Sequence, residues 1–302
     1  MRIVDLFCGI GGVAEASRQL GCGSIVSAID IDQLSNRVYL LNHGVVPLCR
    51  TLESIESLPH GDVIWMSPPC QPYTRRGSQR GADDSRSAAL AHLIMLLEQQ
   101  PPKTLLLENV PDFCDSPHHH ALTEVLKSHS YHIHHEMLCP TQWGVPMRRK
   151  RFYLRASRHE RDVAPIAFSD EKQNASSLIS YLDPDAWSDS ALTVEPTLVE
   201  RYKSAMDILD IEDDNAIAAC FTSAYGESPV RAGSYLRCRQ HNQVRRFSAE
   251  EIVSLMGYRD GFQWPETCTM RQQYRMLGNA LSVQVTNALL RTCHGRADNR
   301  PF

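Results

Sequence analysis

The feature that most constrains the fold is a regular alternation, over residues 3–156, of short apolar runs with stretches of helical periodicity. The apolar runs predict strands at 3–7, 24–29, 63–67, 104–108, 131–138 and 152–156. The stretches between them predict helices at 13–20, 33–42, 88–99 and 119–128. This alternation is typical of an α/β fold in which helices cover both faces of a doubly wound, mostly parallel sheet.

The alternation is lost over residues 158–245, which are rich in Ser, Asp, Asn and Pro. Helical signals return at Ser248, where acidic residues follow a capping residue, and we expect a last helix at 281–291. The sequence therefore predicts a large domain formed by 1–157 and 246–302. A small region, 158–245, is inserted into it.

Composition narrows the class of protein. The 302 residues contain no apolar run of about 18, and the first residues resemble a strand and not a leader, so we expect a cytoplasmic protein without a membrane span. The ten cysteines include no Cys-x-x-Cys pair, and the histidines at 118–120, 132, 134 and 135 follow a helix start and a strand. We therefore expect no metal site and no disulfide framework.

The net charge of -4 does not exclude a nucleic-acid partner, because binding needs only a local positive surface. Residues 148–161 are strongly basic, and residues 228–249 contain five arginines and no acid. A solvated charged surface is the alternative interpretation. The arginines that we expect to contact phosphate are Arg75, Arg76, Arg231, Arg237, Arg239, Arg245 and Arg246.

A glycine-rich turn, Phe7-Cys8-Gly9-Ile10-Gly11-Gly12, follows the first predicted strand. Glycines at the carboxyl end of a strand allow the backbone to approach a ligand. About 20 residues later Asp30 ends the second strand, where a carboxylate can accept hydrogen bonds from ribose hydroxyls. The pair indicates a cofactor that contains adenosine, and both NAD and S-adenosylmethionine are compatible with it.

Cys70 and Glu108 follow two further strands and are candidates for chemistry at the same edge. Pro68 and Pro69 stiffen the loop before Cys70, which favours a presented nucleophile over a buried structural cysteine. An apolar strand precedes Glu108, so we expect a raised pKa there, although a surface glutamate is the alternative. A thiolate, a protonated carboxyl and a sulfonium cofactor together meet the needs of methyl transfer to C5 of cytosine.

In these motifs and their order, the sequence resembles the cytosine-C5 methyltransferases, over about 1–155 and 245–302. The resemblance implies a Rossmann-like fold that uses S-adenosyl-L-methionine, with 158–245 as the target-recognition region. The motifs that resemble those of the family are the glycine loop at 5–12, Asp30, Pro69-Cys70-Gln71, Glu108-Asn109-Val110, Arg149-Lys150-Arg151 and residues 274–280. One departure is Thr51, which stands where the family often has an aspartate for the adenine amino group.

The resemblance implies the following site. Cys70 is the nucleophile, Glu108 acts on N3 of the base, and Arg149 and Arg151 hold the base and the Glu108 loop. The implied cofactor contacts are Phe7, Cys8, Gly9, Ile10, Gly11, Gly12, Asp30, Ile31, Thr51, Leu52, Pro69, Asn279 and Ala280. The implied substrate contacts are Gln71, Thr74, Arg75, Arg76, Cys220, Phe221, Thr222, Arg237 and Arg239.

Two features indicate which branch of the family is involved. The active-site loop continues as Gln71-Pro72-Tyr73-Thr74-Arg75, and Cys220-Phe221-Thr222 lies in a short variable region. Both resemble the branch first catalogued as the second DNA-methyltransferase homologue, whose members methylate cytosine 38 of tRNA. We therefore expect a tRNA substrate and a monomeric enzyme. A DNA methyltransferase of a restriction-modification system is the main alternative, and a non-catalytic nucleic-acid-binding relative is the other.

Overall fold

The computed structural model describes residues 1–302 except 22, 70–87, 167–175, 241–242 and 294–302. Contacts divide the chain into two compact units. The first comprises Met1–Leu138, Lys150–Phe168 and Val285–Phe302, and the second comprises Cys139–Arg149 and Ser169–Gln284. The predicted domain boundaries are a different division, since they assign 139–149 and 246–284 to the large domain, and they stay a prediction.

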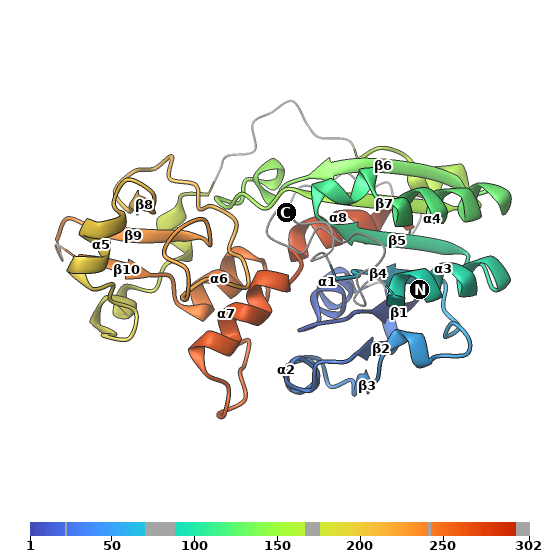
Figure 1. Ribbon diagram of the computed structural model, residues 1–302, viewed down its shortest axis with the longest axis horizontal. Helices are drawn as coiled ribbons and strands as arrows, with labels where there is room; N and C mark the ends of the chain where they lie inside the picture. Colours follow the sequence, from blue (N-terminus) through green and yellow to red (C-terminus); the bar gives the residue numbers. More distant parts are fainter. Residues whose placement is uncertain (22, 70–87, 167–175, 241–242, 294–302) are drawn as a thin grey trace. The chain divides into compact units, whose positions relative to one another are not determined.

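The first unit is built on a seven-stranded sheet with the strand order β3-β2-β1-β4-β5-β7-β6 (Figure 1). The strands are β1 Arg2–Leu6, β2 Ser24–Asp30, β3 Leu48–Cys49, β4 Val63–Met66, β5 Thr104–Asn109, β6 His132–Leu138 and β7 Arg151–Ser157. The pairs from β3 to β5 are parallel, and β7 is antiparallel to both β5 and β6. The predicted α/β class with a mostly parallel sheet is confirmed.

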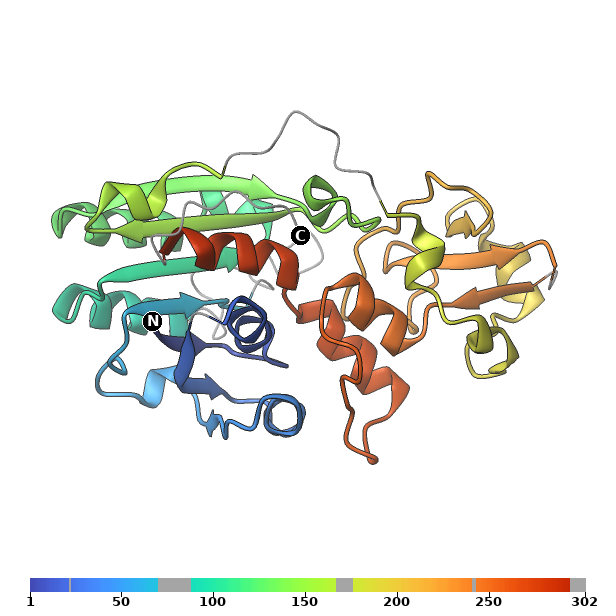
Figure 2. The same cartoon turned by 180° about the vertical axis from the view of Figure 1, so that it is seen from behind.

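Helices cover both faces of this sheet. They are α1 Gly12–Leu20, α2 Gln33–His43, α3 Ala88–Gln99, α4 Pro117–Ser128 and α8 Val283–Cys293. Leucines of α3 and α4 pack with Val4, Leu105 and Leu154 in the main core. On the other face α8 lies beside α1, and Asn287 donates a hydrogen bond to Gln19 across 268 positions of sequence (Figure 2). Among the described helices, none has the length and apolar character needed to cross a bilayer.

The second unit contains a three-stranded sheet, β10-β9-β8, that the sequence did not predict. Its strands are β8 Asp207–Asp210, β9 Ser234–Cys238 and β10 Gln243–Arg246, and its helices are α5 Pro196–Tyr202, α6 Ala249–Leu255 and α7 Met270–Asn279. Short 3-10 helices connect the elements of both units: η1 Leu52–Ser54, η4 Pro111–Asp115, η5 Pro140–Trp143, η6 Glu160–Val163, η7 Leu178–Tyr181 and η8 Pro184–Ser188.

The core of the second unit contains an ion pair. Arg245 is 0% exposed, pairs with Glu251 at 2.7 Å, and lies over the ring of Trp187 at 4.5 Å from its centroid. Glu251 also caps α6, since it accepts the N–H of Ser248 at 2.8 Å. The prediction that Arg245 contacts phosphate is therefore wrong, because its charge is neutralised inside the protein.

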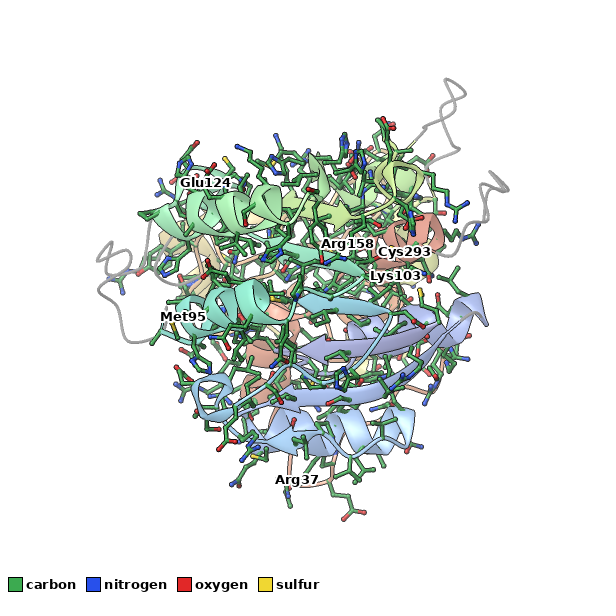
Figure 3. The ribbon with its side chains drawn as sticks, turned by 90° about the vertical axis from the view of Figure 1, so that its right-hand side faces the viewer. Arg37, Met95, Lys103, Glu124, Arg158 and Cys293 are labelled. Atoms are coloured by element: carbon green, nitrogen blue, oxygen red, sulfur yellow. The ribbon has the colours of Figure 1, made fainter. Side chains whose placement is uncertain are left out.

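The strand directions show at which end of the large sheet the parallel strands begin. Lys103 precedes β5 and Arg158 follows the antiparallel β7, and their neighbours Thr104 and Ser157 are paired. Both residues are labelled in Figure 3, which views the first unit from the side where β1, β4 and β5 begin. The glycine-rich turn, Pro69 and Glu108 lie at the opposite end of the sheet, at the carboxyl ends of these parallel strands.

Three histidines on α4 and β6 should make the stability of the folded protein depend on pH. The rings of His119 and His135 lie edge to face with centroids 4.9 Å apart. Burial, with the nearby charges of His119, His134 and Lys127, lowers the pKa of His135 to about 4, and burial also lowers the pKa of His118 and of His119. An unfolded histidine has a pKa of about 6.5. The unfolded chain therefore binds more protons below that pH, and the folded state loses stability as the pH falls.

We expect the free energy of unfolding to fall by about 1 kcal/mol between pH 7.5 and 5. The effect is this small because the His135 side chain is only partly buried, so solvent screens part of it. Urea unfolding at the two pH values measures it. The variant His135→Gln should reduce the pH dependence, whereas His60→Gln, at an exposed loop position, should not. An equal pH dependence in both variants would show that the α4 and β6 histidines are not its source.

Candidate functional site

The glycine-rich turn after β1 is tied to the end of β2. The backbone N–H of Gly9 donates to Oδ2 of Asp30 at 2.9 Å, and the N–H of Asp32 donates to Oδ1 at 2.9 Å. Burial raises the pKa of Asp30, although these N–H groups oppose the shift by stabilising the carboxylate. Each oxygen keeps capacity for a further donor. Asp30 can therefore hold the turn in place and still accept hydrogen bonds from ribose hydroxyls.

The turn also offers space for a ligand. Gly9 has φ +51°, and apart from Gly9 and its two chain neighbours no heavy atom of the described residues lies within 4 Å of the position that its Cβ would occupy. Phe7 adopts a positive φ of 59°, and the side chain of Ile31 is 63% exposed immediately after Asp30. An open backbone beside an acid and an exposed apolar side chain fits a cofactor that contains adenosine.

The other predicted cofactor residues of the first unit have different environments. Cys8 and Leu52 are buried, and Leu52 packs in the main core. Thr51 is exposed and precedes η1, and its hydroxyl replaces the carboxylate that the resemblance suggests there. Thr51 can thus offer at most a neutral hydrogen bond to an adenine amino group.

The predicted nucleophile, Cys70, lies outside the described residues, as do Gln71, Thr74, Arg75 and Arg76. The start of their loop is described. The side-chain amide of Asn109 at the end of β5 donates to the carbonyl oxygen of Pro68 at 3.2 Å. Asn109 is buried, so this bond fixes the backbone two residues before Cys70. The sequence motif contains Asn109, but nothing in it signalled this contact.

Glu108 and Arg151 are brought together on neighbouring strands. Glu108 near the end of β5 and Arg151 at the start of β7 have Oε1 and Nε 3.3 Å apart. The antiparallel register pairs Glu108 with Tyr153, which places Arg151 two residues further along the same face. The guanidinium is therefore positioned to stabilise negative charge on the carboxyl.

Arg149 is in the second unit, although only Lys150 separates it from Arg151. Its side chain is buried, and the residue is 3% exposed. Nη1 donates to the carbonyl oxygen of Phe221 at 3.2 Å and lies 3.5 Å from Sγ of Cys220. Nη2 donates to the carbonyl oxygens of Gly278 and Ala280 at 3.1 and 2.5 Å. These contacts connect two predicted motifs, at 220–222 and 274–280, through one side chain.

The backbone of α7 at Gly278 also approaches the loop at 220–223 closely. A Cβ on Gly278 would lie 2.0 Å from the backbone nitrogen of Ser223, so α7 can pack against this loop only with glycine there. Asn279 is exposed and Ala280 is buried at the end of α7. Phe221 is 1% exposed and packs edge to face with Tyr225 and Phe247. The Phe221 ring thus anchors the loop at 220–222 in the core of the second unit. Its neighbours Cys220 and Thr222 are partly exposed.

The predicted phosphate contacts of the second unit differ in their charge environment. Arg237 on β9 is exposed. Arg239 is exposed too, but its Nη2 is 3.4 Å from Oδ2 of Asp210, which offsets part of its charge. In the part of the chain that the structure describes, no group of three or more His, Cys, Asp or Glu side chains could hold a metal ion. The roles of all these site residues stay predictions.

Comparisons with known proteins give the following findings. The model of the family described as C-5 cytosine-specific DNA methylase matches residues 1–295. The tRNA (cytosine(38)-C(5))-methyltransferase of Schizosaccharomyces pombe is 29% identical over 96% of each chain. The type II methyltransferase M.MspI of Moraxella sp is 26% identical over 95% of this chain and 69% of its own. The crystal structure of the S. pombe Dnmt2 methyltransferase superposes with a TM-score of 0.83 at 26% identity, over 96% of this chain and 97% of that one.

Proposed function

Because the chain belongs to the C-5 cytosine-specific DNA methylase family and is a methyltransferase, we propose that it methylates C5 of cytosine 38 in the anticodon loop of tRNA. The proposal includes S-adenosyl-L-methionine as the methyl donor and Cys70 as the nucleophile. The observation that supports the tRNA substrate best is the likeness to the S. pombe enzyme, whose name states that substrate and which this chain matches over 96% of its length.

The short variable region also supports an RNA substrate. Only residues 158–245 lie between the two parts of the chain that resemble the catalytic motifs of the family. A short recognition region suits a target recognised by shape and phosphate contacts. The bases of an anticodon loop are partly unstacked, so turning one cytosine into an active site costs less than in a duplex.

The chemistry divides among the residues of the chain as follows. The Cys70 thiolate adds to C6 of cytosine while Glu108 gives a hydrogen bond or a proton to N3, which makes C5 nucleophilic. S-adenosyl-L-methionine supplies an electrophilic methyl group for C5. C5 then gives its proton to a base from solvent, N3 returns its proton to the Glu108 carboxylate, and the thiolate leaves C6, which restores the aromatic ring. Arg151, at 3.3 Å from Glu108, stabilises the carboxylate that forms when N3 takes the proton.

The cofactor residues have complementary tasks. Gly9 offers a backbone with open space above it, and Asp30 would accept hydrogen bonds from the ribose hydroxyls. Ile31, which is exposed beside Asp30, would offer an apolar contact to the adenine. Asn109 holds the backbone of Pro68, so that the Cys70 loop starts from a fixed point.

One experiment tests the substrate. The purified protein is incubated with methyl-labelled S-adenosylmethionine and either total tRNA or duplex plasmid DNA, and the 5-methylcytosine is mapped by bisulfite sequencing. We expect label in tRNA at cytosine 38. Label confined to duplex DNA would refute the tRNA proposal and favour a DNA methyltransferase. Absence of label from both tRNA and DNA would refute methyl transfer to either substrate.

Phosphate contact predicts a difference between two neighbouring arginines. Arg237→Ala should weaken tRNA binding several-fold and reduce the dependence of the binding constant on salt by about one counterion, since an exposed arginine is lost. Arg239→Ala should have a smaller effect, because Asp210 already offsets its charge. Filter binding between 50 and 200 mM salt measures both slopes. Equal slopes for Arg237→Ala and the wild type would place Arg237 away from the RNA.

A further inference from the structure

Beneath the glycine-rich turn lies a polar network that none of the predicted roles includes. It connects the end of α2 with α1 and α8 and consists of side chains that are mostly buried. Its central residue is His43, the last residue of α2, whose side chain is 3% exposed. The network matters for function because one of its contacts is the backbone of the proposed cofactor loop.

His43 holds the loop through its outer ring nitrogen. Nε2 lies 3.3 Å from the carbonyl oxygen of Ile10. A carbonyl oxygen can only accept, so Nε2 must bear the proton and donate it. Nδ1 faces Oε2 of Glu15 at 3.9 Å, and the Glu15 side chain is 0% exposed. The two ring nitrogens thus have separate tasks, one toward the loop and one toward a buried carboxylate.

Glu15 is itself fixed in position. Burial raises the pKa of Glu15, but hydrogen bonds from Arg18 and Gln19 and the charges of Arg18 and His43 outweigh it, so its pKa lies below the usual value. Arg18 donates to both carboxylate oxygens, at 2.5 and 3.2 Å, and Gln19 donates at 2.8 Å. Gln19 in turn accepts from Asn287 of α8 at 2.9 Å. The carboxylate that Nδ1 of His43 faces is therefore an anion held by Arg18 and Gln19.

The packing around the ring is equally specific. Gly11 has φ +91°, and a Cβ there would lie 2.4 Å from the His43 ring. Tyr39 lies edge to face with His43 at 5.1 Å, and its hydroxyl donates to Asp5 at 3.4 Å. The imidazole thus occupies the space directly under Gly11, and the loop adopts its conformation around this ring.

We propose that His43 is a positioning residue for the cofactor: it holds the Ile10 carbonyl so that the backbone of Gly9–Gly11 is ordered before S-adenosyl-L-methionine binds. The inference deepens the proposed function and rests on it. A loop that is already ordered loses less conformational entropy on binding, so the contact raises cofactor affinity without touching the reacting atoms. Its loss should raise the dissociation constant and the KM for the cofactor, and leave kcat and the KM for tRNA unchanged.

Two polar substitutions separate the tasks of the ring nitrogens. The amide of His43→Gln takes the place of Nε2 and can still donate to Ile10, whereas the amide of His43→Asn takes the place of Nδ1 and cannot reach Ile10. We expect His43→Asn to raise the dissociation constant of S-adenosylmethionine about tenfold, as the loss of one buried hydrogen bond does. His43→Gln should stay within about threefold of the wild type. Isothermal titration calorimetry measures all three proteins, and thermal unfolding of each shows whether it is folded.

The outcomes are distinct. A tenfold difference between the two variants, with kcat and the KM for tRNA unchanged, supports the inference, even if both unfold at a somewhat lower temperature. Equal affinities in the two variants, whether wild-type or weakened, overturn it, because the Ile10 contact is then irrelevant to binding. A fall in kcat with an unchanged KM for the cofactor also overturns it. A wild-type protein that binds no S-adenosylmethionine refutes the proposed function instead, and the inference with it.

Discussion

Cys70→Ala should lose methyl transfer by at least about a thousandfold and still bind S-adenosylmethionine with wild-type affinity. Removal of a catalytic nucleophile has effects of this size or larger, because the rest of the site cannot replace the covalent step. The proposed cofactor contacts Gly9 and Asp30 lie in the turn after β1 and at the end of β2, whereas Cys70 follows β4, so we expect cofactor binding not to depend on the thiol. The variant therefore separates binding from chemistry.

The measurement combines single-turnover transfer of labelled methyl groups to tRNA with calorimetry of cofactor binding. A suitable control is Cys268→Ala, which removes a partly exposed thiol of the second unit. It should retain full activity. A Cys70→Ala protein that still turns over within tenfold of the wild type would exclude the proposed covalent route, whatever its affinity for the cofactor.

Six of the seven strands of the first unit could be predicted, most of them from short apolar runs, whereas β3, with only two residues, was not predicted. Thr104–Asn109 is buried at every position, and the proposed acid Glu108 is its next-to-last residue, close to the end that the pattern at 104–108 predicts. Parallel strands buried on both faces have this continuous apolar character. The position of Glu108 at the edge of the sheet follows directly from where its strand ends.

The second unit could not be predicted in the same way. Its strands have four or five residues, and β8 pairs with β9 across more than twenty residues of irregular chain. Such short segments give no reliable periodicity. Arg245 shows the consequence for function. In the sequence it is one of several basic residues, and only the fold shows that Glu251 neutralises it in the core.

The Arg149-Lys150-Arg151 motif shows a second limit. The sequence suggests one group of cations, but β7 begins at Arg151, and the two arginines belong to different compact units. Arg151 meets a carboxylate, whereas Arg149 meets carbonyl oxygens. The partners of an arginine depend on backbone far away in sequence, such as Phe221 and Gly278, and residue type alone does not indicate them.

Arg149→Lys should therefore lower the free energy of unfolding by about 3 kcal/mol, although it keeps the charge. The guanidinium reaches the carbonyl oxygens of Phe221, Gly278 and Ala280 from one planar group. A lysine ammonium is a compact point charge that does not reproduce this fork. At least one buried carbonyl then lacks its donor, and each such loss costs about 1–3 kcal/mol.

Urea unfolding followed by fluorescence measures the change, and Arg148→Lys is the matched control, because the neighbouring Arg148 is exposed. The control should unfold within about 0.5 kcal/mol of the wild type, as surface substitutions usually do. Equal stabilities for the two variants would show that the three carbonyl contacts of Arg149 do not hold the loop at 220–222 to the end of α7. A selective loss in Arg149→Lys instead assigns the first arginine of the motif to the support of that loop, and leaves Arg151 as the one that acts at Glu108.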